Sequence, residues 1–548
     1  MIRATAAVAV ATLALAGHAG AARFAVGVDP RASLPRVAAQ LRSFGSVSFE
    51  LARLHALVVQ GRSVRGVRRI EGVRWVEWLG TRRRRLAFTP TDPLAAKQWY
   101  LEQDHAFDFW PTLPVGLPTV RVAIIDSGID ATHPEFLGKI IQTKSFVGGT
   151  PNDTNGHGTF VAGEIAADLN NNEGIAGMAF PALLLVAKVV RPDGSVSLEG
   201  EAEAIRWAVD RGARVINLSL GGLRDPRDPN RDTYSPLEAA AVNYAAGRGA
   251  VIVASVGNSD QAPQTPWPFA SYPAALPHVL GVSALARDGS VPLFSDRDQI
   301  YNDIAAPGQD IFSTLPRALT KTENPTCVDQ GYSDCGPDEF RHAEGTSFAA
   351  PQVAAAAALL MAQDPKLTSD QVTTVLERTA DDANASNGCT HCPLLRDALT
   401  GWGRLDVAKA LGVITKGPPP PADKFETNDD AGASARRIFG AHGTIKATID
   451  FWDDPVDVYA LALRPGQTLT ATFRGPVDTA DDLLLWSPQT QSVNTPVDLA
   501  FRVVRSTKPG SNQRLAYTVP RGAGGLYYLE VKITEPGSGR YTLKFLKR

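Results

Sequence analysis

The sequence predicts an α/β fold for the central part of the chain, a parallel sheet with helices on both faces. Short apolar runs alternate there with helical segments and glycine-rich turns; the runs span 120–125, 183–189, 215–218 and 251–256. This alternation is typical of strands buried on both faces of a parallel sheet. A small mixed segment precedes the region, and a proline run separates it from a stretch of short alternating strands.

Length and charge limit the alternatives. The chain has 548 residues, and single hydrophobic cores stop growing near roughly 250–300 residues. The formal net charge of −2 at pH 7 provides no general attraction for nucleic acid or anionic lipid. We therefore expect several domains, no nucleic-acid partner and a monomer.

The first 21 residues have the pattern of a secretory signal peptide. Arg3 is followed by an apolar stretch at 4–16 and then by the small residues Ala19, Gly20 and Ala21. A membrane anchor is the alternative, but it needs about 20 apolar residues, and Gly17 and His18 interrupt this run. We expect export, cleavage after Ala21, a secreted (extracellular) product and no membrane span in the mature chain.

Residues 22–85 predict a small α+β unit. Residues 24–28, 56–60 and 73–78 alternate like strands, and residues 34–41 have helical spacing. The unit ends at four consecutive arginines, 82–85. A charge run of this kind is solvated and exposed, so we expect it to be easily cut.

The residue pattern changes again after the central region, 86–414. The linker 415–422 contains four consecutive prolines, which form a stiff extended spacer. Residues 423–548 then contain short alternating strands, among them 458–463, 468–473, 527–533 and 541–545, with turn residues between them. This pattern predicts an all-β sandwich.

The cysteines fit an exported protein with a few disulfide bonds. Of three possible pairings, proximity favours Cys327 with Cys335 and Cys389 with Cys392. A zinc site using Cys389, His391 and Cys392 is the alternative, but the second Cys-x-x-Cys pair that would close it is missing.

Two motifs suggest an acid and a base at the edge of the sheet. Asp126 follows a buried apolar run directly and precedes Ser127 and Gly128, which places a carboxylate where open α/β sheets bind ligands. His157 lies between Gly156 and Gly158 where an Ala-rich helix begins. Taken alone, Asp126 is equally well a turn residue that caps the next element. A lone histidine is more often structural, but packing does not readily explain a histidine between two glycines at a helix start.

A third motif places a serine before a long apolar helix. Ser347 lies in the run Gly345-Thr346-Ser347-Phe348-Ala349-Ala350-Pro351, which opens a helix expected over 352–361. The N–H groups and positive dipole end of a helix N-terminus suit an anionic intermediate. An ordinary N-cap is the alternative interpretation.

Together the motifs resemble the signatures of the subtilisin-like serine proteases, the subtilase family. The chain order Asp126, His157, Ser347 is that of subtilisin. The segment ending at Gly257-Asn258 resembles the family's oxyanion-hole segment. The resemblance spans about residues 92–411 and implies a serine endopeptidase in which Asn258 stabilises the oxyanion.

The resemblance also implies how protein or peptide substrates bind. An extended peptide would lie along Ser219, Leu220, Gly221 and Gly222, and the pocket for the residue before the scissile bond would be lined by Ser255, Gly257 and Ser271. None of these side chains is charged, so a neutral or apolar preference is expected.

Calcium (Ca²⁺) is the one cofactor that the resemblance implies, and no organic cofactor is expected. The loop 169–175 resembles the family's calcium loop. The implied oxygen ligands are the carbonyls of Leu169, Glu173 and Ile175 and the side chains of Asn171, Glu135 and Asp92. Glu135 stands where the family usually has Asp, and a solvated turn is the alternative.

The flanking regions resemble known accessory domains. Residues 24–80 resemble the family's inhibitory prodomain, which acts as an intramolecular inhibitor until it is cut away, so the protein is expected to be an autoprocessed precursor (zymogen). Residues from 423 onward resemble the pre-peptidase C-terminal domain of secreted bacterial proteases. The carboxylates at 453, 454 and 457 suggest a metal site, although a solvated acidic turn is the simpler interpretation.

Two rival functions use the same residues. One is a catalytically dead subtilase fold that only binds a surface, against which the intact set of Asp126, His157, Ser347 and Asn258 argues. The other is an esterase or amidase of small molecules, against which only the peptide-pairing segment and the prodomain argue.

Overall fold

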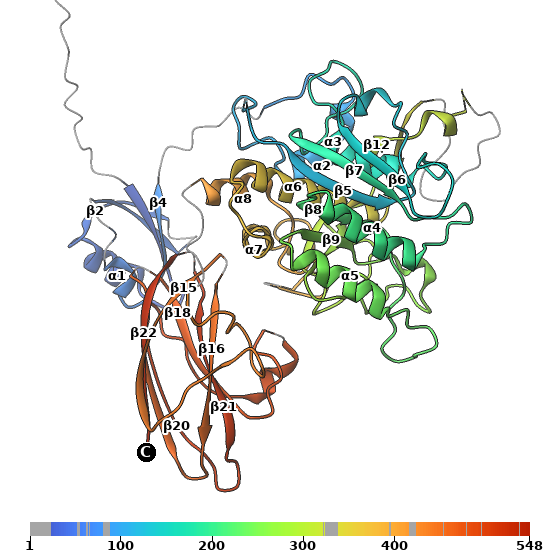
Figure 1. Cartoon of the computed structure of the whole chain (residues 1–548). Helices are drawn as coiled ribbons and strands as arrows, with labels where there is room; N and C mark the ends of the chain where they lie inside the picture. The colour runs from blue at the N-terminus through green and yellow to red at the C-terminus, as the bar shows by residue number, and fades with distance from the viewer. Residues whose placement is uncertain are drawn as a thin grey trace, which may run out of the picture. The chain divides into compact units, whose positions relative to one another are not determined.

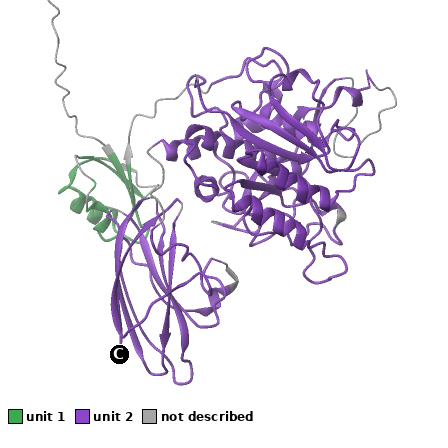
Figure 2. Cartoon of the chain, in the orientation of Figure 1, with its two compact units in different colours: residues 1–85 green, residues 86–548 purple. Residues whose placement is uncertain are grey.

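The computed structural model describes residues 23–51, 55–61, 64, 66–79, 88–114, 116–321, 323, 338–393, 396–415, 423–452, 454–477, 479–494, 496–535 and 537–548. The expected signal peptide at 1–21, the arginine run at 82–85, linker residues 416–422, Cys327 and Cys335 lie outside this set. The chain forms two compact units, residues 1–85 and 86–548 (Figure 2).

The first unit is an antiparallel sheet with one helix. The strand order is β2-β3-β1-β4, with β1 Arg23–Val28, β2 Gly45–Leu51, β3 Ala56–Gly61 and β4 Val73–Leu79. Helix α1, Leu34–Leu41, contributes Val37 and Leu41 to a core that includes Phe24 and Leu57. The predicted helix and three predicted strands are confirmed, whereas β2 was missed.

The centre of the second unit is a seven-stranded parallel sheet. Its order is β11-β10-β9-β8-β5-β7-β6. The strands are β5 Val120–Asp126, β6 Ile140–Ser145, β7 Ala182–Lys188, β8 Val215–Leu218, β9 Val251–Ser255, β10 Val279–Leu285 and β11 Ile304–Pro307. The predicted α/β class is confirmed, and the four predicted runs correspond to β5, β7, β8 and β9.

Helices cover both faces of this sheet (Figure 1). Because side chains alternate along a strand, β5 sends Val122 and Ile124 into one core, with α3 His157–Ala166 and α6 Ala350–Gln363. It sends Ala123 and Ile125 into the other, with α4 Leu198–Asp210 and α5 Pro236–Ala246.

Helix α6 is buried along nearly its whole length, which explains its run of alanines. Its outer side packs against α7 Ser369–Thr379 and α8 Val407–Ile414. The short helix α2 Trp99–Gln103 and the paired strands β12 Ile311–Thr314 and β13 Phe340–Ala343 complete this part of the unit.

The C-terminal part is a β-sandwich, as the alternating pattern predicted. A five-stranded sheet has the order β14-β16-β21-β18-β19 and a four-stranded sheet the order β15-β22-β17-β20. Their bounds are β14 Arg436–Arg437, β15 His442–Asp450, β16 Val456–Leu463, β17 Thr468–Arg474, β18 Asp481–Trp486, β19 Arg502–Ser506, β20 Asn512–Thr518, β21 Gly525–Ile533 and β22 Ser538–Lys547. Both sheets contribute to one core, with Leu461 and Leu529 from one and Phe473 and Leu543 from the other.

Across the described residues, no helix combines the length and the apolar character needed to cross a membrane.

Candidate active site

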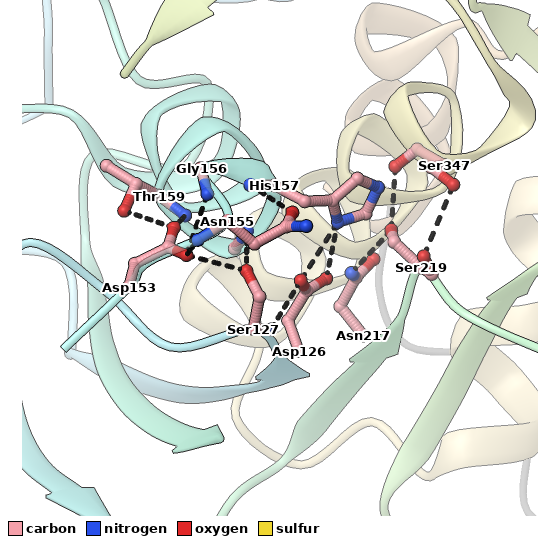
Figure 3. A network of polar contacts seen from close by, with 11 residues as sticks. Asp126, Ser127, Asp153, Asn155, Gly156, His157, Thr159, Asn217, Ser219 and Ser347 are labelled. Carbon is pink, nitrogen blue, oxygen red and sulfur yellow. Dashed lines mark hydrogen bonds and ion pairs between the residues drawn. The ribbon is translucent and has the colours of Figure 1, made fainter. Parts of the chain in front are cut away.

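The carboxyl end of β5 meets the start of α3. Because all seven strands run parallel, their carboxyl ends share one edge of the sheet, and β5 ends there with Asp126. His157 is the first residue of α3, and its Nδ1 lies 2.9 Å from Asp126 Oδ1 and 3.0 Å from Oδ2 (Figure 3). The structure therefore joins the carboxylate and the imidazole that the sequence placed in separate motifs.

The Asp126 carboxylate is held in place and almost completely buried. Its Oδ1 accepts the N–H of Ser127 at 2.6 Å. Burial alone would lower the pKa of His157, but the charge of Asp126 and its hydrogen bond outweigh burial, so the pKa of His157 is raised. The charge of Asp153 adds to this increase.

Close backbone contact joins the two segments. The N–H of Gly158 donates to Ser127 Oγ at 2.9 Å. A Cβ at position 158 would lie 2.3 Å from the carbonyl oxygen of Gly128, far inside any van der Waals contact. Glycine is therefore required at 158 for α3 to approach the end of β5.

Asp153 organises the turn that leads into α3, a role that the sequence analysis did not anticipate. Its Oδ1 accepts from Ser127 Oγ at 2.8 Å and from the N–H groups of Asn155 and Gly156, and its Oδ2 accepts from the N–H and Oγ1 of Thr159 (Figure 3). The bond from Oδ1 to the N–H two residues further on is an Asx-turn contact, and an Asp in a turn was the only signal of it available in the sequence. This carboxylate links the Asp126 segment to the His157 segment.

Ser347 precedes α6, as expected, and α6 begins two residues before the expected start at 352. Ser347 belongs to a 3₁₀ turn, Thr346–Phe348, and α6 begins at Ala350. The serine is thus not on the helix itself, because the chain tightens into the 3₁₀ turn before entering α6. Pro351 lies in the first turn of α6, where a missing backbone N–H costs little.

The hydroxyl of Ser347 is hydrogen-bonded to Ser219, the residue that follows β8. Ser347 Oγ donates to the carbonyl oxygen of Ser219 at 3.2 Å, and Ser219 Oγ donates to the carbonyl oxygen of Ser347 at 2.7 Å. Figure 3 shows the second ring nitrogen of His157 on the side of Ser347. Ser219 therefore positions the serine at the sheet edge next to the imidazole.

Asn258 follows β9 at the same edge. Its Oδ1 accepts from the N–H and the Oγ1 of Thr346, each at 3.0 Å. A backbone N–H can only donate, so this contact identifies the amide oxygen. The Nδ2 group of Asn258 is therefore the end of the amide that can donate to a ligand.

A cleft of about 160 Å³ lies beside Ser347 and Asn258. Its lining includes six of the seven predicted substrate-binding residues, namely Leu220, Gly221, Gly222, Ser255, Gly257 and Ser271. The seventh, Ser219, instead holds Ser347. Thr346, Leu223 and Asp260 also line the cleft and were not predicted.

Gly222 differs from the expectation in one respect. Its N–H and C=O are both paired with Tyr272, at 2.9 Å in each direction. The backbone groups of Gly222 are therefore already hydrogen-bonded within the protein. Leu220 and Gly221 also line the cleft, and they do not share this pairing with Tyr272.

The predicted calcium loop lies next to two buried carboxyl groups. Asp92 accepts the N–H groups of Asn170 and Asn171 at 2.9 and 3.1 Å, and Glu135 Oε1 accepts the N–H of Ile175 at 2.9 Å. Glu135 Oε2 is buried without a hydrogen-bond partner among the described residues. Burial, with the charge of Asp92 adding to it, raises the pKa of Glu135 to about 8.

The remaining predicted ligands lie on the same loop. Asn171 Oδ1 accepts the N–H of Glu173 at 2.7 Å. Within the described part of the chain, the carbonyls of Leu169, Glu173 and Ile175 accept no backbone N–H. Two buried carboxyls, an amide oxygen and three such carbonyls, all on this loop or bonded to it, are hard oxygen donors of the kind that Ca²⁺ prefers.

Cys389 and Cys392 form a disulfide bond. Both sulfurs are therefore engaged, which excludes the alternative zinc site with His391, because a cysteine binds zinc only as a free thiolate.

The acidic segment of the C-terminal part is not a solvated turn. Asp457 is fully buried and accepts from Tyr541 Oη at 2.6 Å. One carboxylate oxygen from each of Glu426, Asp454 and Asp457 lies within 4.8 Å of the other two. Burial raises the pKa of Asp457 to about 7 and that of Glu426 to about 8. The three acids lie close enough together to hold a metal ion. Asp453, the third predicted carboxylate, lies outside the described residues.

Comparison with known proteins places this site in a family. The model of the Subtilase family matches residues 118–403. The chain is 35% identical over 297 residues to the thermophilic serine proteinase of Bacillus sp. (strain AK1), covering 54% of this chain and 65% of that protein. It is 34% identical over 298 residues to thermitase of Thermoactinomyces vulgaris, covering 54% of this chain and 92% of thermitase.

Two further proteins are similar to parts of this chain. Subtilisin E of Bacillus subtilis (strain 168) is 34% identical over 308 residues, covering 53% of this chain and 71% of subtilisin E. A solved protease structure from Pseudoalteromonas arctica aligns with a TM-score of 0.47 at 26% identity, covering 60% of this chain and 99% of that one. The family match over residues 118–403 and the identity to thermitase and subtilisin E show that the chain belongs to the subtilase family, and that its central part is a subtilisin-like serine endopeptidase.

Proposed function

We propose that this protein is a secreted endopeptidase that hydrolyses peptide bonds in proteins through an acyl-enzyme on Ser347, and that it is made as an autoprocessed precursor. The observation that carries the proposal is the placement of Asp126, His157 and Ser347 at one sheet edge, beside a cleft that Asn258 also lines.

The geometry supports a defined role for each residue. Ser347 Oγ leaves the carbonyl of Ser219, transfers its proton to His157 Nε2 and attacks the scissile carbonyl carbon. His157 then gives that proton to the leaving amine as the C–N bond breaks, and water hydrolyses the ester by the reverse sequence. Asp126, bonded to Nδ1, holds the ring and stabilises the imidazolium.

The developing oxyanion needs donors that are already in position. Thr346 holds the amide oxygen of Asn258, so Nδ2 is oriented before substrate arrives. The N–H of Ser347 is the second donor in this proposal. Preorganisation matters because a donor that need not rotate stabilises the transition state without a reorganisation cost.

The precursor is proposed to have five parts. These are a signal peptide at 1–21, an inhibitory prodomain at 22–85, the catalytic domain at 86–414, a linker at 415–422 and a C-terminal β-sandwich at 423–548. The division of the chain into compact units at residue 85 supports the second boundary. A large parallel sheet has many non-local contacts and forms slowly, which supports a folding role for the prodomain.

Ser347→Ala should abolish both catalysis and maturation. Wild-type protein should react with a fluorophosphonate probe, and intact-mass measurement should find a mature N-terminus between residues 80 and 88. The variant should remain unlabelled and full-length. A labelled variant, or a folded wild type that reacts with neither probe nor peptide, would contradict the proposal and favour the binding module. Cleavage of small esters without cleavage of any peptide would favour the esterase.

Asn258→Ala should lower kcat while KM changes little, because the lost donor acts on the oxyanion and not on the ground-state carbonyl. Removing one such donor in this same family lowers kcat by about 10²–10³, and we expect that range. Steady-state kinetics on one peptide substrate, with Asp288→Asn as an exposed-acid control, measure the effect. An unchanged kcat would remove Asn258 from the mechanism.

Asp153→Asn should shift the acid limb of the kcat/KM profile to lower pH. His157 must be neutral to accept a proton, so activity rises as it deprotonates, and its raised pKa places that limb above the ordinary value of 6.5. Removing the charge of Asp153 lowers the pKa of His157. The profile is measured on correctly folded protein, with Asp288→Asn as control; a limb that stays in place shows that Asp153 has no electrostatic effect on His157.

Calcium should stabilise the protein through Asp92, Glu135 and the loop 169–175. A ligand at 100 times its Kd stabilises the folded state by about 2.7 kcal/mol, and we expect Tm to rise by about 5 °C or more. Glu135→Gln should remove most of this response, whereas the exposed Asp193→Asn should keep it. Both are compared in a Ser347→Ala background, which prevents self-digestion. An equal response in both variants would exclude this site.

A further inference from the structure

A buried carboxyl group lies behind the substrate cleft. Asp296, on the loop between β10 and β11, is fully buried. Its Oδ1 lies 2.9 Å from Ser259 Oγ and its Oδ2 3.4 Å from Ser271 Oγ, both within hydrogen-bond distance. Its N–H donates to the carbonyl of Gly257 at 3.1 Å. Ser271 and Gly257 line the cleft, so Asp296 forms the layer directly beneath its wall.

The wall between Asp296 and the cleft is thin. A Cβ at position 257 would lie 2.4 Å from Ser271 Oγ and 2.5 Å from Asp296 Oδ2. Gly257 also has a φ of 104°, in the left-handed region that favours glycine. With no side chain there, the two oxygens converge on the backbone that lines the cleft.

Asp296 has no cation beside it within the part of the chain that is described. No ion pair there includes Asp296, whereas the neighbouring Asp298 is paired with Arg224 at 2.8 Å. The groups that act on the Asp296 carboxyl are Ser259, Ser271 and the charge of Asp260. Burial raises the pKa of Asp296 to about 8, although the two serine hydrogen bonds partly offset it. A positive charge nearby would favour the ionised form.

The second acid at the cleft differs in its surroundings. Asp260 lines the cleft but is exposed, so water and salt screen its charge. Asp296 is shielded from solvent, where an electrostatic interaction is stronger. Of the two acids, the buried one therefore interacts more strongly with a cation that enters the cleft, because that cation favours its ionised form.

We propose that Asp296, acting through Ser271, makes this cleft prefer lysine or arginine as the residue before the scissile bond. The cationic tip would lie against Ser271 Oγ, which accepts from it while donating to Asp296. The substrate thus supplies the positive charge that the fold does not. The proposal rests on the function proposed above, and it replaces the neutral or apolar preference expected from the lining residues alone.

The test uses the mature protein and two peptide p-nitroanilides that differ only in the residue before the scissile bond. This residue is lysine in one and methionine in the other, because the two side chains have similar length. Wild-type kcat/KM should be at least about tenfold higher for lysine. Asp296→Asn should lower the lysine-to-methionine ratio about tenfold or more, and the matched variant Asp260→Asn should lower it less.

The outcomes separate this inference from the proposed function. Cleavage of methionine or other apolar substrates in preference to lysine, with normal fluorophosphonate labelling, would overturn the inference and leave the endopeptidase intact. A larger loss in Asp260→Asn than in Asp296→Asn would also overturn it. If Asp296→Asn does not fold, Ser271→Ala replaces it: the inference requires the ratio to fall at least about threefold, and an unchanged ratio overturns it.

Discussion

The buried contact between Asp126 and His157 is the interaction on which the rest of the site depends. A carboxylate this buried is stable only when a partner compensates its lost hydration. The parallel sheet supplies the position, because β5 must end where α3 begins. The contact sets the orientation of the imidazole, which in turn decides where Ser347 has to lie.

Backbone hydrogen bonds hold this contact in register. Asp153 accepts from three N–H groups of the turn and of α3 and also from Ser127 Oγ, while Ser127 Oγ accepts from Gly158. Because the same two side chains connect the end of β5 with the start of α3, neither segment can move without breaking several bonds. A site built on element ends is held rigidly by this means, whereas a site on loops alone is held less precisely.

Sequence patterns predicted the parts of the molecule that depend on local chemistry. Strands such as β8 and β9 are mostly apolar because both faces of the sheet are covered, so they were predictable. The 3₁₀ turn at Ser347 was not, since a tight turn and the first turn of a helix have similar residues. Asp296 was not predictable either, because its partner Ser271 lies 25 residues away along the chain and only the fold brings them together.

Buried carboxyl groups recur in this protein, and their surroundings distinguish them. Asp126 faces an imidazole, Glu135 faces a second carboxyl and a loop of oxygen donors, and Asp296 faces the wall of the cleft. The protein provides each of these carboxyl groups with some hydrogen bonds. No cationic side chain is among the groups that act on Glu135 or Asp296. Since an isolated buried carboxylate is too costly to ionise, a cation that comes close to Glu135 or Asp296 favours the ionised form of that acid. What lies or comes close to each acid differs: an imidazole fixed by the fold at Asp126, an ion from solvent in the calcium proposal for Glu135, and the side chain of a substrate in the proposal for Asp296.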